Sequence, residues 1–186
     1  MDLSDYLRIQ AHANHLMNQR LAHACATLSE ADFHAPRVSF FPSLAATLNH
    51  LLEVDLFYVA VLEGDASART VFDDFQPATN AADWNARQRA VDQRLLAFCE
   101  RLDAAGCNAA VAIPRANQVQ RDRVAPLLAH LFMHQTHHRG QVHAMLSGST
   151  VAPPQLDEFM MPSEAHLREA DMAALGWREA QVYGRA

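Results

Sequence analysis

Histidines are concentrated in one stretch of this sequence, from Pro126 to Leu146, which holds five of the eleven in the chain. The spacing of apolar residues there predicts an amphipathic helix, and His134 and His138 fall on its apolar stripe. Residues four apart lie one turn apart on nearly the same side of a helix, so these two imidazoles can converge on one ion. Zinc-like ions usually take at least three protein ligands, with nitrogen at about 2.0 to 2.1 Å, so a third group must come from elsewhere.

His50 is the candidate for that third ligand. It lies beside the broad apolar face of a helix predicted over 43–63, which Gly64 ends. A lone histidine on such a face is more typical of a core or boundary residue, but the histidine pair elsewhere favours ligation. Glu53 and Asp55 follow it closely. Each is a candidate general base, a carboxylate that supports His50, or a member of a helix-surface ion pair.

The neighbours of the histidine pair narrow the chemistry. The pair has the spacing of the HExxH motif, but Gln135 stands where zinc proteases carry their general base, so a protease of that type is disfavoured. Gln141 can either orient a ligand or simply pack against the helix. His130 could extend the site by one turn, and His137 is expected to support the ligands or lie on the surface. No residue is assigned as catalytic.

Four long helices are predicted to position these side chains, because apolar residues recur at the helical period between turn-forming segments. The helix over 81–105 has the cleanest apolar stripe, with steps of four and three that suit packing at a shallow angle in a bundle. The predicted ranges are 3–28, 43–63, 81–105 and 126–146, followed by a short helix over 163–175.

Two features of the chain leave alternatives open. The segment 107–123 could form a short β-hairpin or a long crossover loop, and we favour a loop with some extended character. In the first helix, Asn14, His15 and Asn18 either face solvent or point inward deliberately, and the solvent-facing interpretation is favoured.

Composition and charge exclude several classes of function. The chain has 186 residues, half of them hydrophobic, which favours one helical domain over 1–186. A net charge of -6 with scattered basic residues argues against nucleic acid, and the charged N-terminus lacks a signal peptide's apolar centre. We therefore expect a cytoplasmic protein with no membrane partner. Three cysteines without CxxC spacing indicate neither a disulfide framework nor a cysteine zinc site.

Four segments of the sequence together point to a known family. They are AHANHLMNQRL in the first helix, SLAATLNHLLEVDLFYVAVLEGD in the second, HLFMHQTHHRGQVHAML in the fourth, and the PPQLD that follows. With these segments the sequence resembles the DinB-like family, also called DinB/YfiT-like, over most of its length. This resemblance implies an all-α, up-down-down-up four-helix bundle in which His50, His134 and His138 hold a divalent metal ion.

Three imidazole ligands would leave at least one coordination position open, as in a catalytic site. The resemblance therefore implies a metal-dependent enzyme that activates a thiol or water, similar to S-transferases and isomerases that use low-molecular-weight thiols such as bacillithiol or mycothiol. It also implies a homodimer. The alternatives are a metal-binding stress-response or interaction protein without turnover, and a structural bundle whose histidines are accidental. Zinc or nickel is the expected ion, and imidazoles also suit iron and copper.

Overall fold

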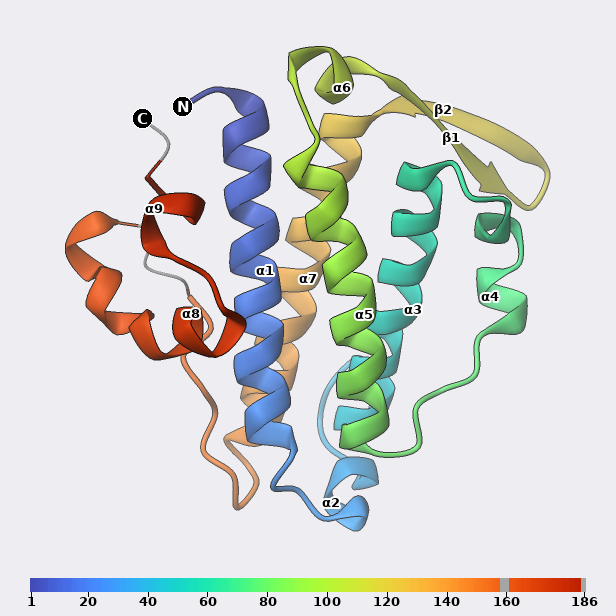
Figure 1. Cartoon of the computed structure of the whole chain (residues 1–186). Helices are drawn as coiled ribbons and strands as arrows, with labels where there is room; N and C mark the ends of the chain where they lie inside the picture. Colours follow the sequence, from blue (N-terminus) through green and yellow to red (C-terminus); the bar gives the residue numbers. More distant parts are fainter. Residues whose placement is uncertain (158–160, 185–186) are drawn as a thin grey trace.

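The computed structural model describes residues 1–157 and 161–184, and most of them are helical. Its body is made of four long helices that lie side by side (Figure 1). They are α1 (Leu3–Cys25), α3 (Leu44–Glu63), α5 (Ala81–Glu100) and α7 (Val124–Leu146). The predicted helices are thus present, with ends that differ by up to five residues.

Each long helix packs against two others. Both α1 and α3 contact α5 and α7, so α1 and α3 lie at opposite corners of the group. In the view of Figure 1, α1 and α7 run downward and α3 and α5 run upward.

The helix ends follow from local chemistry. Asp2, Ser43 and Asn80 precede α1, α3 and α5, and each side chain accepts a hydrogen bond from a backbone N–H of the first turn. Gly64 ends α3 with a φ of 71°, a conformation that glycine adopts without steric cost. The range 81–105 predicted for the third long helix implies that Gly106 ends it, and this is wrong. That helix ends at Glu100, and Gly106 lies within the short helix α6 (Ala104–Asn108).

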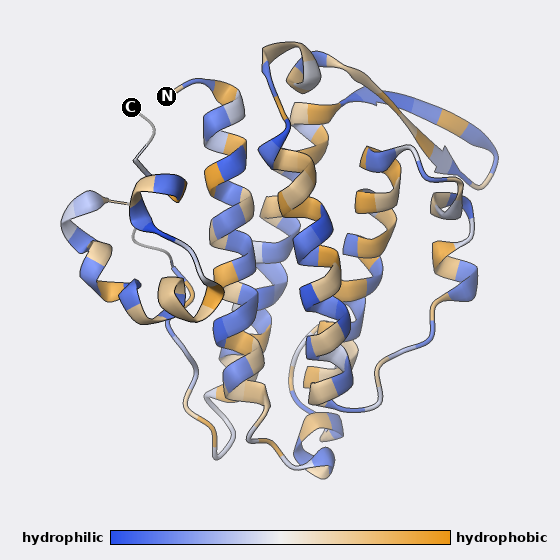
Figure 2. Cartoon of the chain, in the orientation of Figure 1, coloured by the Kyte–Doolittle hydropathy of each residue, from blue (hydrophilic) through white to orange (hydrophobic). Residues whose placement is uncertain are grey.

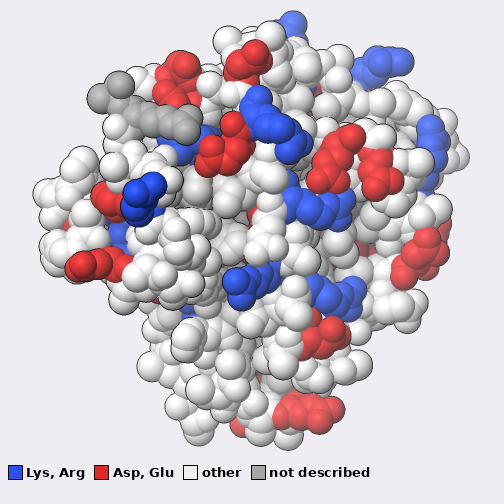
Figure 3. All heavy atoms as spheres, in the orientation of Figure 1, with Lys and Arg blue, Asp and Glu red and all other residues white. Residues whose placement is uncertain are grey.

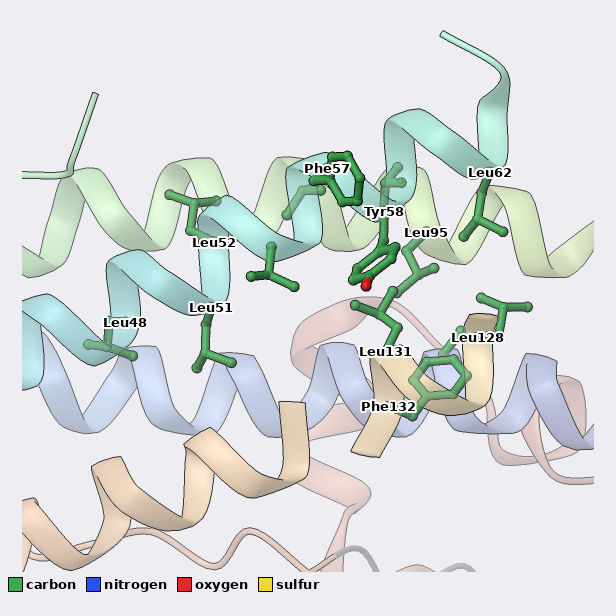
Figure 4. Close-up of a cluster of buried hydrophobic side chains, with 14 of the residues drawn as sticks. Leu48, Leu51, Leu52, Phe57, Tyr58, Leu62, Leu95, Leu128, Leu131 and Phe132 are labelled. Carbon is green, nitrogen blue, oxygen red and sulfur yellow. The ribbon is translucent and has the colours of Figure 1, made fainter. Parts of the chain in front are cut away.

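The hydrophobic core fills the space between the four long helices. Leucines and aromatic residues meet there, as Figure 4 shows for Tyr58 of α3, Leu95 of α5 and Leu131 of α7. Figure 2 shows α3 as the most apolar of the long helices. By length and composition α3 could cross a membrane, but 78% of its most apolar window is buried inside the protein. Such burial is typical of the core helix of a soluble protein.

Residues 110–123 correct the prediction of a loop, and with it the purely all-α class. Strands β1 (Ala110–Arg115) and β2 (Gln118–Arg123) form an antiparallel hairpin in which Arg115 pairs with Gln118. Val111 and Ile113 alternate with exposed residues and are buried against the bundle. This period of two is what a half-buried strand requires, and Pro114 is tolerated because the hairpin has only two strands.

The short elements between the long helices were not predicted, because each is too short to show a period. The C-terminal segment folds as the 3-10 helix η2 (Pro162–Leu167) and two short helices, α8 (Glu169–Leu175) and α9 (Glu179–Val182), where one helix over 163–175 was predicted. Met172 and Val182 pack there on Leu16 and Met17 of α1. The short elements between the long helices are α2 (Glu30–His34), η1 (Ala66–Arg69), α4 (Val71–Asp74) and α6 (Ala104–Asn108).

Charged side chains are mixed on the surface. On the face shown in Figure 3, basic and acidic residues are interspersed, and neither sign dominates a region of it. A mixed surface of this kind gives no electrostatic footprint for a nucleic acid on that face.

Candidate metal centre

Three of the predicted residues come together between α3 and α7. His50 on α3 and His134 and His138 on α7 place one ring nitrogen each within 4.8 Å of the others. The Nε2 atoms of His50 and His134 are 3.0 Å apart. We call these three residues the histidine triad. Spacing on α7 predicted the pair, and the packing of α3 on α7 supplies the third ring.

The dimensions of the triad fit a small divalent ion. With metal–nitrogen bonds of about 2.0 to 2.1 Å, ligand nitrogens in a tetrahedral site are about 3.3 Å apart. The His50–His134 separation is close to this value, and the remaining nitrogens lie within a distance that small side-chain rotations would close. Three nitrogen donors without a carboxylate or thiolate suit zinc, nickel, copper and iron alike.

Gln141 orients one member of the triad. The Nδ1 atom of His138 donates to Oε1 of Gln141 at 2.8 Å, and the amide nitrogen of Gln141 lies 3.2 Å from Nε2 of His137. With the proton of His138 on Nδ1, the lone pair of its Nε2 is available to an ion. The orienting interpretation of Gln141 is thus supported by a direct contact, and His137 takes the supporting place expected for it.

Electrostatics keep the triad neutral. Burial lowers the pKa of all three imidazoles, and the neighbouring rings lower them further. The effect is strongest at His134, whose pKa falls to about 3. The Nδ1 atom of His134 is buried, and no described group accepts or donates a hydrogen bond there. Neutral imidazoles with free lone pairs are the form that binds metals.

A groove opens beside the triad. It has a volume of about 600 Å³, and His50, Phe41 and Glu53 are among the residues that line it. The Phe41 ring lies 4.4 Å from the ring of His50 and 5.6 Å from that of His138, so it covers one side of the triad. Burial raises the pKa of Glu53. Most of the other lining residues are apolar, among them Phe75, Pro77 and Ala78.

Two candidates from the sequence lie outside the triad. His130 is exposed, its ring is 6.3 Å from that of His134, and it packs on Tyr58. Asp55 is only 1% exposed, so it belongs to no helix-surface ion pair, and its hydrogen bonds go to Gln88 and Gln135 rather than to His50. Asp55 points to the centre of the bundle because it lies five residues beyond His50, on another side of α3.

That centre holds a polar cluster which sequence reasoning missed. Arg139 donates to the side-chain oxygens of Asn14, Asn18 and Gln135 at 2.5, 3.1 and 3.1 Å. Two of these amides also donate hydrogen bonds to carboxyl groups: Asn18 donates to Asp92 at 3.0 Å, and Gln135 donates to Asp55. Gln88 bridges the two acids, at 2.7 Å from Asp55 and 3.1 Å from Asp92. We call this set the central network; its members are Asn14, Asn18, Asp55, Gln88, Asp92, Gln135 and Arg139.

Burial sets the charge state of the central network. It raises the pKa of Asp55 to about 6, although hydrogen bonds from the two glutamines oppose the shift. Burial raises the pKa of Asp92 to about 8, and the charge of Asp55 adds to the effect. The pKa of Arg139 falls to about 10 for the same reason. At neutral pH, Asp92 therefore holds its proton while Asp55 and Arg139 carry opposite charges.

A sequence signal for the central network existed. Polar residues recur four apart on three of the four long helices, as Asn14/Asn18, Gln88/Asp92 and Gln135/Arg139. Such pairs share one face of a helix, as the histidine pair does. The prediction that Asn14, His15 and Asn18 face solvent is wrong, because all three are buried.

Comparisons with known proteins identify a family and a related fold. The model of the DinB family matches residues 9–172. The chain is similar to Protein DinB of Bacillus subtilis (strain 168), with 24% identity over 158 residues that cover 81% of this chain and 91% of that protein. Its fold resembles the crystal structure of YjoA, a DinB-like protein from Bacillus subtilis, with a TM-score of 0.59, 16% identity, and coverage of 81% of this chain and 99% of that one.

Proposed function

Because this chain belongs to the DinB family, we propose that it binds one divalent metal ion through His50, His134 and His138 and uses it to activate a thiol or a water molecule toward a small substrate. The observation that carries the proposal is the convergence of three neutral imidazoles beside an open groove. A divalent ion held there would act as a Lewis acid and lower the pKa of a thiol or water that binds beside it.

The residues around the triad support this proposal in different ways. Gln141 fixes the proton of His138 on Nδ1. Phe41 excludes water from one side of His50, and the groove beyond it offers an apolar surface for a substrate. The amide of Gln135 is engaged with Asp55 and Arg139, which is a further argument against a protease mechanism based on HExxH. No general base is assigned.

Elemental mass spectrometry of the untagged protein tests the metal site. We expect close to one ion of zinc or nickel per chain, lost in His50→Ala, His134→Ala and His138→Ala. His130→Ala is the matched control, because this exposed histidine lies on the same helix outside the triad. Circular dichroism confirms that each variant folds. A metal-free wild type that also takes up no zinc or nickel on titration would refute the site.

Cobalt(II) distinguishes the enzyme from the main alternative. If the bound ion is open to thiols, adding 2-mercaptoethanol to the cobalt-loaded protein produces a sulfur-to-metal absorption band in the near ultraviolet. A subsequent screen of thiols with electrophilic substrates identifies turnover. Stoichiometric metal binding without a thiol band, and without hydrolysis of any ester or amide tested, would instead favour a metal-binding stress-response or interaction protein.

We also propose that the whole chain is one cytoplasmic domain, a four-helix bundle of up-down-down-up connectivity, which binds neither nucleic acid nor membrane. The helix directions in Figure 1 support the connectivity. A homodimer is supported by an exposed apolar patch of Tyr6 and Met133 between α1 and α7. Size-exclusion chromatography with light scattering tests it, and Met133→Glu is expected to give a monomer.

A further inference from the structure

A second pocket opens between α1 and α5, with Ala174 of α8 at its edge, whereas the histidine triad is carried by α3 and α7. Its volume is about 200 Å³, enough for a small metabolite and well below the usual size of a drug-like site. Its lining is mainly polar, and it reaches three members of the central network, Asn18, Gln88 and Asp92. The lining residues are His15, Asn18, Gln19, Ala22, His23, Asn85, Gln88, Arg89, Asp92 and Ala174.

The inner end of this pocket is built from buried polar side chains with unused hydrogen-bonding capacity. His15, Asn18, Gln88 and Asp92 are each at most 4% exposed. Among the described residues, the Oε1 atom of Gln88 and the Nδ1 atom of His15 have no hydrogen-bond partner. A buried acceptor without a donor costs about 1 to 3 kcal/mol, so a ligand that supplies donors there would recover that energy.

Charge indicates which donor suits this end. The central network contains two carboxyl groups and one guanidinium, so it is one positive charge short when both acids are ionised. Burial, and after it the charge of Asp55, raises the pKa of Asp92, so a proton on Asp92 keeps the network neutral when the pocket is empty. A cation with N–H donors, placed against Asp92 and the free oxygen of Gln88, would take the place of that proton, keep the network neutral and satisfy the orphaned acceptor.

The outer end of the pocket has the opposite character. Arg89 is exposed there and forms no ion pair with any carboxylate of the described residues, and His23 and Asn85 are exposed beside it. We propose that the pocket binds a small zwitterion, with a primary ammonium group at Asp92 and Gln88 and a carboxylate at Arg89. Amino acids with a short chain between the two groups are the class of ligand that this arrangement fits.

Isothermal titration calorimetry tests this proposal with glycine, β-alanine and γ-aminobutyrate. Butylamine and butyrate are the matched comparators, since each lacks one of the two charged groups. We expect one zwitterion to bind at one per chain, at least tenfold more tightly than either comparator. Asp92→Asn should weaken its binding by about tenfold or more, as expected for the loss of a charged partner, and Arg89→Gln by several-fold.

A surface variant keeps the test valid if changes at the network impair folding. Ala174→Trp should narrow the mouth and weaken binding, whereas Ala170→Trp, at an exposed position on the same helix outside the pocket lining, should have no effect. Two results would overturn the proposal. The first is no saturable binding of any zwitterion up to about 10 mM, because a dissociation constant above that concentration is too weak for a specific site. The second is equal affinity for both tryptophan variants and for wild type.

Discussion

Helix α7 carries two polar clusters on adjacent residues, His134 and His138 in one and Gln135 and Arg139 in the other. The histidine triad lies beside a groove, and one ring nitrogen of each histidine faces those of the other two. The central network lies inside the bundle, where each member donates to or accepts from another, and only its edge at Gln88 and Asp92 reaches the polar pocket between α1 and α5. The difference separates two uses of buried polarity: side chains that meet only around a ligand, and side chains that already hold one another in the folded chain.

The largest effect should come from removing the single guanidinium of the central network. Arg139→Met would leave two carboxyl groups and three amides without their cation, and breaking a buried ionic cluster in this way costs about 3 to 5 kcal/mol. Urea denaturation followed by circular dichroism measures this loss. His134→Ala, one turn away, is the control and should cost clearly less in metal-free protein.

If Arg139→Met were no less stable than His134→Ala, the central network would be structurally neutral and the comparison would fail. Adding Asp55→Asn to Arg139→Met should recover part of the stability, because Asp55 is the acid that is ionised at neutral pH and would be left without a positive charge in the network.

Metal should stabilise the protein through the triad alone. At free zinc about 1,000-fold above the dissociation constant, binding adds about 4 kcal/mol to the free energy of unfolding. Differential scanning fluorimetry with zinc, and with a chelator, measures the shift in melting temperature. The shift should vanish in His138→Ala and persist in Asp92→Asn. A shift that survives without His138 would place the ion elsewhere.

The contact of Gln141 with His138 gives a smaller effect. Gln141→Ala removes the acceptor that holds the His138 proton on Nδ1, and changes of this kind typically weaken metal binding by about 10- to 100-fold. Competition with a chromophoric chelator measures the affinity. Gln141→Glu keeps an acceptor in place and should bind metal at least as tightly as wild type, which a purely packing role for Gln141 would not produce.

The change in the free energy of unfolding with pH is the smallest of these effects, and it tests the central network directly. The pKa of Asp92 is raised from 3.8 to about 8 in the folded protein, so the folded state keeps a proton that the unfolded chain loses. The stabilisation from this proton is full below about pH 4 and is lost as the pH rises through about 8, by at most about 1.4 kcal/mol per pH unit.

Asp92→Asn isolates that contribution. The stability of wild type minus that of the variant should decline between pH 4 and pH 8, whereas the same difference for Glu53→Gln should change less. Urea denaturation at several pH values measures both differences. A flat difference for Asp92→Asn would mean that Asp92 titrates normally and that the network is open to water.

The sequence alone predicted the long helices and the triad because both depend on spacing within one element. The apolar period predicted the helices, and the four-residue step predicted His134 and His138. His50 was the candidate third ligand from its place beside an apolar helix face, and the resemblance to the family implied the same residue. The central network depends on which faces of four helices meet, which spacing alone does not specify. The buried positions of Asn14 and Asn18 were therefore misjudged, although their spacing matched that of the histidine pair.

The hairpin was missed for a different reason. Its β2 strand is exposed throughout and mostly polar, so it lacks the alternation that marks a strand, and only β1 shows buried Val111 and Ile113. Pairing between the strands, rather than the pattern of either one, creates this element.

Because the two clusters alternate along α7, they also affect how easily this helix unfolds locally and exposes its backbone to solvent. Over residues 134 to 139, one side of α7 faces His50 of α3 and an adjacent side is hydrogen-bonded to α1 and α3. Local fraying of this turn would have to disrupt both clusters, so its backbone amides should exchange hydrogen for deuterium only through global unfolding. The middle of α7 is thus expected to be the slowest-exchanging segment of the chain, with the exposed strand β2 among the fastest.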